Sequence, residues 1–151
     1  MDGFPFGNLL LNLAILAWAV AQTLKLLINL AVNGKGTWRV LFSSGGMPSS
    51  HSATVCALAS AAVCLHGWDS PYFAISAVVA VVVMYDACNV RQETGKQAQI
   101  LNYMMDNWGQ IRPEELFEKS LKELIGHTPF QVLMGGVLGV AVGWAGAAIW
   151  G

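Results

Sequence analysis

Residues 129–150 read PFQVLMGGVLGVAVGWAGAAIW and contain no Asp, Glu, Lys or Arg. A helix needs about 20 apolar residues to cross the hydrocarbon core of a bilayer, so this stretch predicts a transmembrane helix. Three more apolar runs precede it and predict spans at about 9–32, 52–69 and 71–88. Of the 151 residues, 55% are hydrophobic and 11% are charged, whereas soluble domains carry roughly 25% charged residues. We therefore expect an all-α fold, a polytopic membrane helix bundle with about four transmembrane helices.

The composition also limits the organisation of the chain and its partners. Four spans leave no room for a second domain, so residues 1–151 are expected to form one membrane-embedded domain. The first residues, MDGFPFGN, are acidic where a secretory signal is positive, so we expect an uncleaved membrane helix. The formal net charge of −1 argues against a nucleic-acid partner. An odd number of cysteines predicts small buried residues instead of a disulfide framework; they are Cys56, Cys64 and Cys88.

The basic residues predict the orientation of the spans. With four spans, residues 33–51 and 89–128 lie on one side of the membrane, and they hold every Lys and Arg except Lys25. Cytoplasmic loops carry an excess of Lys and Arg. Both loops are therefore expected in the cytoplasm, and both termini outside.

Two further helices are expected on the cytoplasmic side. Apolar residues recur at helical spacing from about 97 to 108, which predicts that the third span continues as a helical extension. Residues 113–125, PEELFEKSLKELI, begin with Pro and two Glu and carry their apolar residues on one face. They predict a short amphipathic helix on the membrane surface that ends at Gly126.

Two histidines stand beside the cytoplasmic starts of transmembrane helices. His51 lies in SSGGMPSSHSA, residues 43–53, where Ser49 or Ser50 can cap the helix that follows. His127 is followed by Thr128 and then Pro129, which suit the cap and first turn of the last span. A helix amino terminus offers free N–H donors and a positive dipole to an anion. By itself, the His51 motif is explained equally well as a capped turn with a surface histidine.

Charged residues in and near the first and third spans extend this pattern. The first span carries polar residues within an arc of about 140°, and together with its flanks they are Asn8, Asn12, Gln22, Lys25, Asn29 and Asn33. An ammonium group inside the span either snorkels to the surface or meets an anion. With the two histidines, Lys25, Arg39 and Arg91 would form a phosphate-sized cationic pocket that can move protons. A carboxylate at the membrane edge needs a partner, but Asp86 and Arg91 lie about 140° apart on a straight helix and are not expected to pair.

Three stretches together resemble a known family. GGMPSSHSA, MYDACNVRQETGKQAQILN and LKELIGHTPFQV, in this order, resemble the divergent type-two phosphatidic acid phosphatases, which are related to acid phosphatases and vanadium-dependent haloperoxidases. The resemblance covers the chain from Gln22 to Gly136. It implies metal-independent and cofactor-free hydrolysis of a phosphomonoester or pyrophosphate on a membrane lipid.

The resemblance also implies roles for individual residues. Residues 48–51 match the Pro-Ser-Gly-His motif of the wider superfamily with Ser in place of Gly, which makes His51 the acid. His127 would be the nucleophile that attacks phosphorus. The phosphate of the substrate would be bound by Lys25, Arg39, Ser49, Ser50 and Arg91.

The chain departs from the superfamily in one catalytic position and in its number of spans. The nucleophilic histidine is usually followed four residues later by an aspartate, but here that residue is Gln131. The amide oxygen of Gln131 could accept a hydrogen bond from His127, or Asp86 could act as the catalytic carboxylate from the third span. The superfamily usually has six spans, whereas this chain has four. Whether the chain turns over substrate is therefore open.

Two other functions are compatible with the same residues. A protein that binds or assembles lipid phosphates without catalysis would keep the anion pocket. A metal site of His51, His127 and Asp86 is a two-histidine, one-carboxylate set, but nearby Lys and Arg would repel a cation.

Small residues in the last span predict a close helix contact. Gly135, Gly139 and Gly143 recur every four residues, a pattern that lets helices approach closely. The contact lies either within one chain or in a homodimer through this face.

Overall fold

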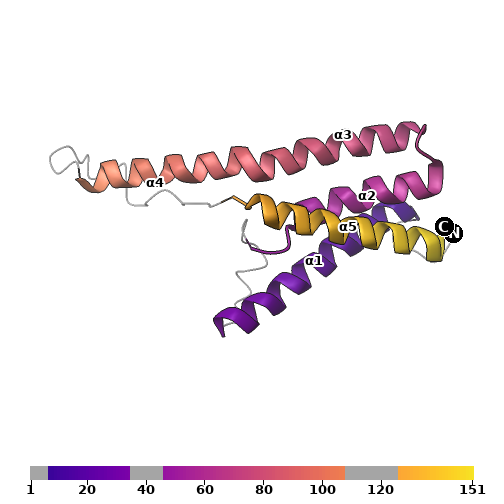
Figure 1. Ribbon diagram of the computed structural model, residues 1–151, viewed down its shortest axis with the longest axis horizontal. Helices are drawn as coiled ribbons and strands as arrows, with labels where there is room; N and C mark the ends of the chain where they lie inside the picture. Colours follow the sequence, from indigo (N-terminus) through magenta and orange to yellow (C-terminus); the bar gives the residue numbers. More distant parts are fainter. Residues whose placement is uncertain (1–6, 35–45, 108–125) are drawn as a thin grey trace.

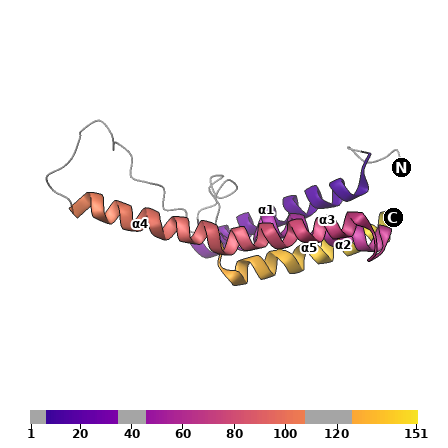
Figure 2. The same ribbon diagram turned by 90° about the horizontal axis from the view of Figure 1, so that it is seen from above.

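The structure is a computed structural model that describes residues 7–34, 46–107 and 126–151. In these ranges all regular structure is helical, as predicted, and the elements are α1 (Leu9–Asn33), α2 (Ser50–His66), α3 (Pro71–Tyr85), the π-helical turn η2 (Asp86–Val90), α4 (Arg91–Asn107) and α5 (Pro129–Trp150). Figures 1 and 2 show a bundle of α1, α2, α3 and α5, with α4 projecting beyond it as a continuation of α3.

Helix α2 is the centre of the bundle, because it packs against α1, α3 and α5. Its buried positions are small residues, among them Ser52, Ala53, Ala57 and Ala61. Small side chains let neighbouring backbones come close, which is how helices associate in an apolar solvent. The core is therefore built from close backbone approach, with few large buried side chains.

The glycines of α5 lie in this contact. A Cβ atom at Gly135, Gly139 or Gly143 would overlap backbone atoms of Ser49, Ala53 or Ala57 respectively. The contact therefore lies within the chain, which is the first of the two alternatives. A homodimer remains a prediction, but it cannot use these glycines while α2 covers them.

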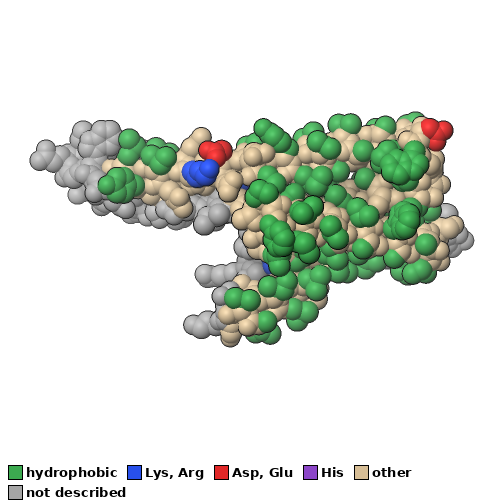
Figure 3. Space-filling model, in the orientation of Figure 1, with side chains coloured by type: hydrophobic (Ala, Val, Ile, Leu, Met, Phe, Trp, Pro, Cys, Tyr) green, Lys and Arg blue, Asp and Glu red, His purple; other side chains and the backbone are tan. Residues whose placement is uncertain are grey.

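Within residues 7–34, 46–107 and 126–151, three helical segments are long and apolar enough to cross a membrane: Leu9–Val32, Pro71–Met104 and Pro129–Trp150. Helix α2 is apolar but has 17 residues. It ends three residues before the predicted end at residue 69, because Gly67, at φ +83, ends it and Ser70 caps α3. Large apolar side chains cover the outside of the bundle (Figure 3), as expected of a surface that faces lipid. The chain is a membrane protein.

Helix starts follow the predicted caps. The side-chain oxygen of Ser49 accepts the backbone N–H of Ser52, so Ser49 caps α2. Thr128 caps α5 and Pro129 occupies its first turn. The predicted helical extension is α4, whereas the predicted amphipathic helix at 113–125 lies outside the described residues.

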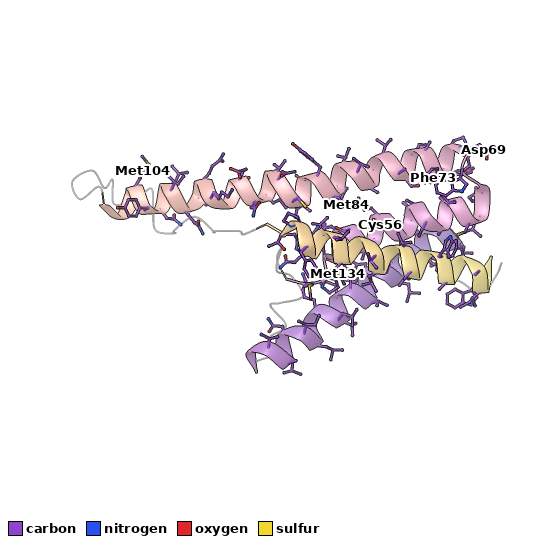
Figure 4. All side chains as sticks on the ribbon, in the orientation of Figure 1. Cys56, Asp69, Phe73, Met84, Met104 and Met134 are labelled. Carbon is purple, nitrogen blue, oxygen red and sulfur yellow. The ribbon has the colours of Figure 1, made fainter. Side chains whose placement is uncertain are left out.

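The cysteines are free, as predicted, and one of them joins two helices. The thiol of Cys56 on α2 lies 3.7 Å from the sulfur of Met84 on α3 (Figure 4). Cys88 is half-buried, but Cys64 is exposed, so the expectation that all three are buried is wrong. Cys64 instead lies on the lipid-facing surface of α2, where a small apolar residue costs little.

The expectation that Asp86 and Arg91 do not pair is also wrong. The Nε atom of Arg91 donates to Oδ2 of Asp86 over 2.9 Å. The expectation assumed a straight α-helix, but residues 86–90 form a π-helical turn. In that geometry hydrogen bonds join residues five apart, so a side chain lies above the one five positions before it.

Candidate functional site

The two histidines lie together at one end of the bundle. The ring centroids of His51 and His127 are 6.0 Å apart, and the rings are edge to face. His51 stands in the first turn of α2, and His127 directly precedes the cap of α5. The backbone N–H of Ser49 donates to the carbonyl oxygen of Gln131 over 3.1 Å. Two helix amino termini therefore meet beside the histidines, and both favour an anion.

Hydrogen bonds fix the tautomer of His127. The Nδ1 atom of His127 lies 3.3 Å from Oε1 of Gln131, which also accepts the backbone N–H of Thr128 over 3.2 Å. An amide oxygen only accepts hydrogen bonds, so Nδ1 carries the proton and Nε2 carries the lone pair. His127 is fully buried, and its Nε2 has no hydrogen-bond partner among the described residues. A buried nitrogen with an unused lone pair suits a nucleophile.

The surroundings keep this histidine neutral. Burial is the largest cause that lowers the pKa of His127, and the bond to Gln131 raises it. The positive charges of Lys25, His51 and Arg91 lower the pKa further. Since these charges act on His127, the site gathers cations around a neutral imidazole.

Two cationic side chains of the predicted pocket are described. Lys25 is 3% exposed, and a Cβ atom at Gly46 would touch its methylene groups at 3.4 Å. Gly46 adopts φ +99, which favours glycine, so the loop before α2 can cover the lysine stem. Arg91 is half-exposed and is held by Asp86. Arg39 lies outside the described residues.

The predicted serines differ in what their hydroxyl groups do. Ser49 is fully buried, and its oxygen accepts from the backbone N–H and the hydroxyl of Ser52. It therefore holds the start of α2 in place. Ser50 is buried in the first turn of α2, directly before His51.

Asp86 does not orient His127, because its carboxylate pairs with Arg91 and the imidazole bonds to Gln131. The alternative metal site is also wrong: among the residues that the structure describes, no three His, Cys, Asp or Glu side chains gather closely enough to hold a metal ion. The sequence reasoning missed Ala87, whose carbonyl accepts the backbone N–H of His127. A backbone acceptor leaves no signal in residue types.

Comparison with known proteins identifies the family of the chain. Residues 6–142 match the family described as the Divergent PAP2 family. The chain belongs to the Divergent PAP2 family. It is similar to the uncharacterized membrane protein YuiD of Bacillus subtilis (strain 168), with 40% identity over 149 residues, which cover 93% of this chain and 91% of that protein. No solved structure matches the chain. The resemblance to this family seen in the sequence is thus confirmed, and the chain is a PAP2-related membrane protein.

Proposed function

We propose that the protein hydrolyses a phosphomonoester or pyrophosphate on a membrane lipid, with His127 as the nucleophile and His51 as the general acid. The observation that carries the proposal is the state of His127. Gln131 holds the proton on Nδ1, and Nε2 is buried without a hydrogen-bond partner among the described residues. A neutral imidazole in this tautomer attacks through Nε2.

The reaction has two steps. First, Nε2 of His127 bonds to phosphorus while the bond from phosphorus to the lipid oxygen breaks, and protonated His51 gives its proton to that oxygen. Lys25 and Arg91 stabilise the charge on the equatorial oxygens. Water then attacks phosphorus, His51 takes a proton from the water, and the bond between phosphorus and nitrogen breaks. Phosphate leaves, and His127 returns to its neutral tautomer.

The depth of the site favours a lipid substrate. His51 and His127 lie at the first turns of two apolar helices, which is where a bilayer meets water. Lys25 lies within an apolar segment, about two turns before the end of α1. A phosphate at this level would belong to a headgroup, and its acyl or prenyl chains would lie against the exposed apolar side chains of the bundle.

Phosphate release from phosphatidic acid, phosphatidylglycerophosphate and polyprenyl phosphates by the purified protein tests the proposal. We expect the His127→Ala variant to lose release and the His66→Ala variant to keep it. His66 is a matched control, because it lies at the opposite end of α2 and packs against Tyr72. Orthovanadate, which resembles five-coordinate phosphorus, should inhibit the wild type. Wild-type rates for His127→Ala on all three lipids would contradict the assignment.

One observation favours a second function, the binding of lipid phosphates without turnover. The partner of His127 is the neutral amide of Gln131, where the superfamily has a carboxylate. An amide fixes the tautomer, but it stabilises a positive imidazolium less than a carboxylate does. Vanadate binding with no phosphate release from the wild type would support this function. Phosphate release by the Gln131→Asp or Gln131→Glu variant would then show that the wild-type site lacks a carboxylate beside His127.

A further inference from the structure

The π-helical turn η2 contacts the site through its backbone. Arg91 donates its backbone N–H to the carbonyl oxygen of Asp86, five residues earlier. In an α-helix that N–H would bond to Ala87, four residues earlier. The carbonyl of Ala87 therefore loses its α-helical donor, and it accepts the backbone N–H of His127 over 3.2 Å. The π-turn thus creates the acceptor that holds the backbone of His127.

The residue before His127 lies against the same turn. Gly126 is buried, and a Cβ atom there would lie 2.6 Å from the backbone nitrogen of Gln92 and 2.9 Å from the carbonyl carbon of Arg91. Its φ is not in the left-handed region, so glycine is required here for space and not for backbone freedom. An alanine would push residues 126 and 127 away from the helix.

The same turn also places a charged pair. The side chains of Asp86 and Arg91 meet across it at 2.9 Å, through Nε of the arginine. A guanidinium group has five N–H donors, and this bond uses the one on Nε. The pair therefore orients Arg91 while its terminal nitrogens keep their donors for an anion.

We propose that η2 sets His127 and Arg91 in register for phosphoryl transfer, with Gly126 and Asp86 as positioning residues; this inference rests on the proposed function. This turn supplies the carbonyl of Ala87 that accepts the backbone N–H of His127. Gly126 packs against its end, and across it Asp86 orients the side chain of Arg91. A displacement of about 1 Å costs about 100-fold in rate when reacting groups must be aligned. Neither positioning residue touches the substrate.

The first test replaces Gly126 by alanine. We expect Gly126→Ala to lower kcat for phosphatidic acid about 100-fold. We also expect the pKa of His127 to rise, as measured by NMR of labelled histidine without substrate, because the ring leaves its buried place. The control is Gly136→Ala, whose Cβ atom would meet only side-chain sulfur atoms, the nearest at 3.5 Å. It should change neither quantity, and thermal unfolding in detergent shows whether each variant is folded.

The second test separates the two positioning roles. Deletion of Cys88 shortens the π-turn to an α-turn, in which Asp86 and Arg91 still pair at a spacing of four. The N–H of Gln92 then takes the carbonyl of Ala87, so kcat should fall while KM changes little. Asp86→Asn should do the opposite and raise KM about tenfold, because Arg91 loses a charged hydrogen bond. Asp86→Glu keeps the carboxylate, so its KM should stay close to the wild-type value.

The outcomes distinguish this inference from the proposed function. Wild-type kcat and a wild-type pKa of His127 in both Gly126→Ala and the Cys88 deletion would overturn the positioning role. If the wild type releases no phosphate, the proposed function is wrong. The pKa of His127 and the affinity for orthovanadate then still decide the inference, since neither needs turnover. If Gly126→Ala does not fold, the Cys88 deletion and Asp86→Asn decide it.

Discussion

The backbone N–H of Ser49 donates to the carbonyl oxygen of Gln131 over 3.1 Å, and this single bond joins the first turns of α2 and α5. Ser49 caps the helix that carries His51, and Gln131 bonds to the ring of His127. The distance between the two histidines is therefore set by how closely these two helices pack. The glycines of α5 maintain that packing along the rest of the interface.

Replacement of Gly139 by alanine should destabilise the bundle. The new Cβ atom would overlap the backbone of Ala53, and overpacking of this kind costs about 1–3 kcal/mol. Gly136→Ala on the same helix should be neutral or stabilising, since alanine is the better helix former by about 1 kcal/mol. Unfolding of both variants in detergent measures the difference. Equal stabilities would show that α2 and α5 do not pack as described.

Gln131→Met should remove the acceptor for His127 while keeping a side chain of similar size. Loss of the partner that orients a metal-ligating histidine costs about 10- to 100-fold in activity, and we expect a fall of similar size in kcat here. NMR of labelled histidine should show a mixture of the two tautomers in place of the Nδ1–H form. A single Nδ1–H tautomer in the variant would mean that another group orients the ring.

The pH dependence follows from the environment of His127. Burial lowers its pKa below the ordinary value of 6.5, so the neutral, nucleophilic form persists at pH 6.5. The protonated form of His127 cannot attack phosphorus, so the acidic limb of the kcat/KM profile should follow this lowered pKa. Gln131→Glu places a carboxylate beside the ring, favours the imidazolium, and should move the acidic limb to higher pH. An acidic limb above pH 6.5 in the wild type would contradict the assignment.

Lys25→Met should weaken anion binding. Hydrogen bonds to charged groups contribute about 1.5–3 kcal/mol, so the affinity for orthovanadate should fall about 10- to 100-fold. Thermal unfolding in detergent shows whether the variant is folded. Lys96→Met is the control, since that lysine is exposed and pairs with Glu93 away from the site. Equal vanadate affinities in the two variants would remove Lys25 from the site.

His51→Ala should be sensitive to the leaving group. With a lipid phosphate the leaving oxygen needs a proton, and general acid catalysis contributes about 100- to 10,000-fold. With p-nitrophenyl phosphate the leaving group needs none, so the loss should be much smaller. Steady-state rates on both substrates measure the ratio. A loss of the same size on both substrates would assign His51 a role other than that of the acid.

Much of the fold was predictable because it depends on local properties of the sequence. The free energy of placing a segment in a bilayer depends mainly on its own side chains, so uncharged runs such as residues 129–150 predict spans. Caps are equally local, which is why Thr128 and Pro129 marked the start of α5. The end of α2 was placed at residue 69, three residues too late, because hydropathy does not mark the point at Gly67 where the backbone turns.

The candidate site was predictable in its residue types and in part of its geometry. Each histidine stands beside a helix start, so the two were expected to meet if both helices begin at the same end of the bundle. Their ring centroids lie 6.0 Å apart. The choice between Gln131 and Asp86 as the partner of His127 was open, since residue type alone allows both. The structure pairs Gln131 with the ring because the cap of α5 already turns its amide oxygen toward Nδ1.

The sequence by itself determined an all-helical membrane bundle, its helix starts, and the gathering of histidines and cations at one end, because hydropathy and capping act over a few residues. Only the tertiary structure decided that Asp86 pairs with Arg91 and that Ala87 holds the backbone of His127. Both depend on a π-turn, and no periodicity within residues 86–90 distinguishes that turn from an α-helix. The extra residue of the turn leaves the carbonyl of Ala87 without its α-helical donor, and the backbone N–H of His127, which is distant in sequence, satisfies it.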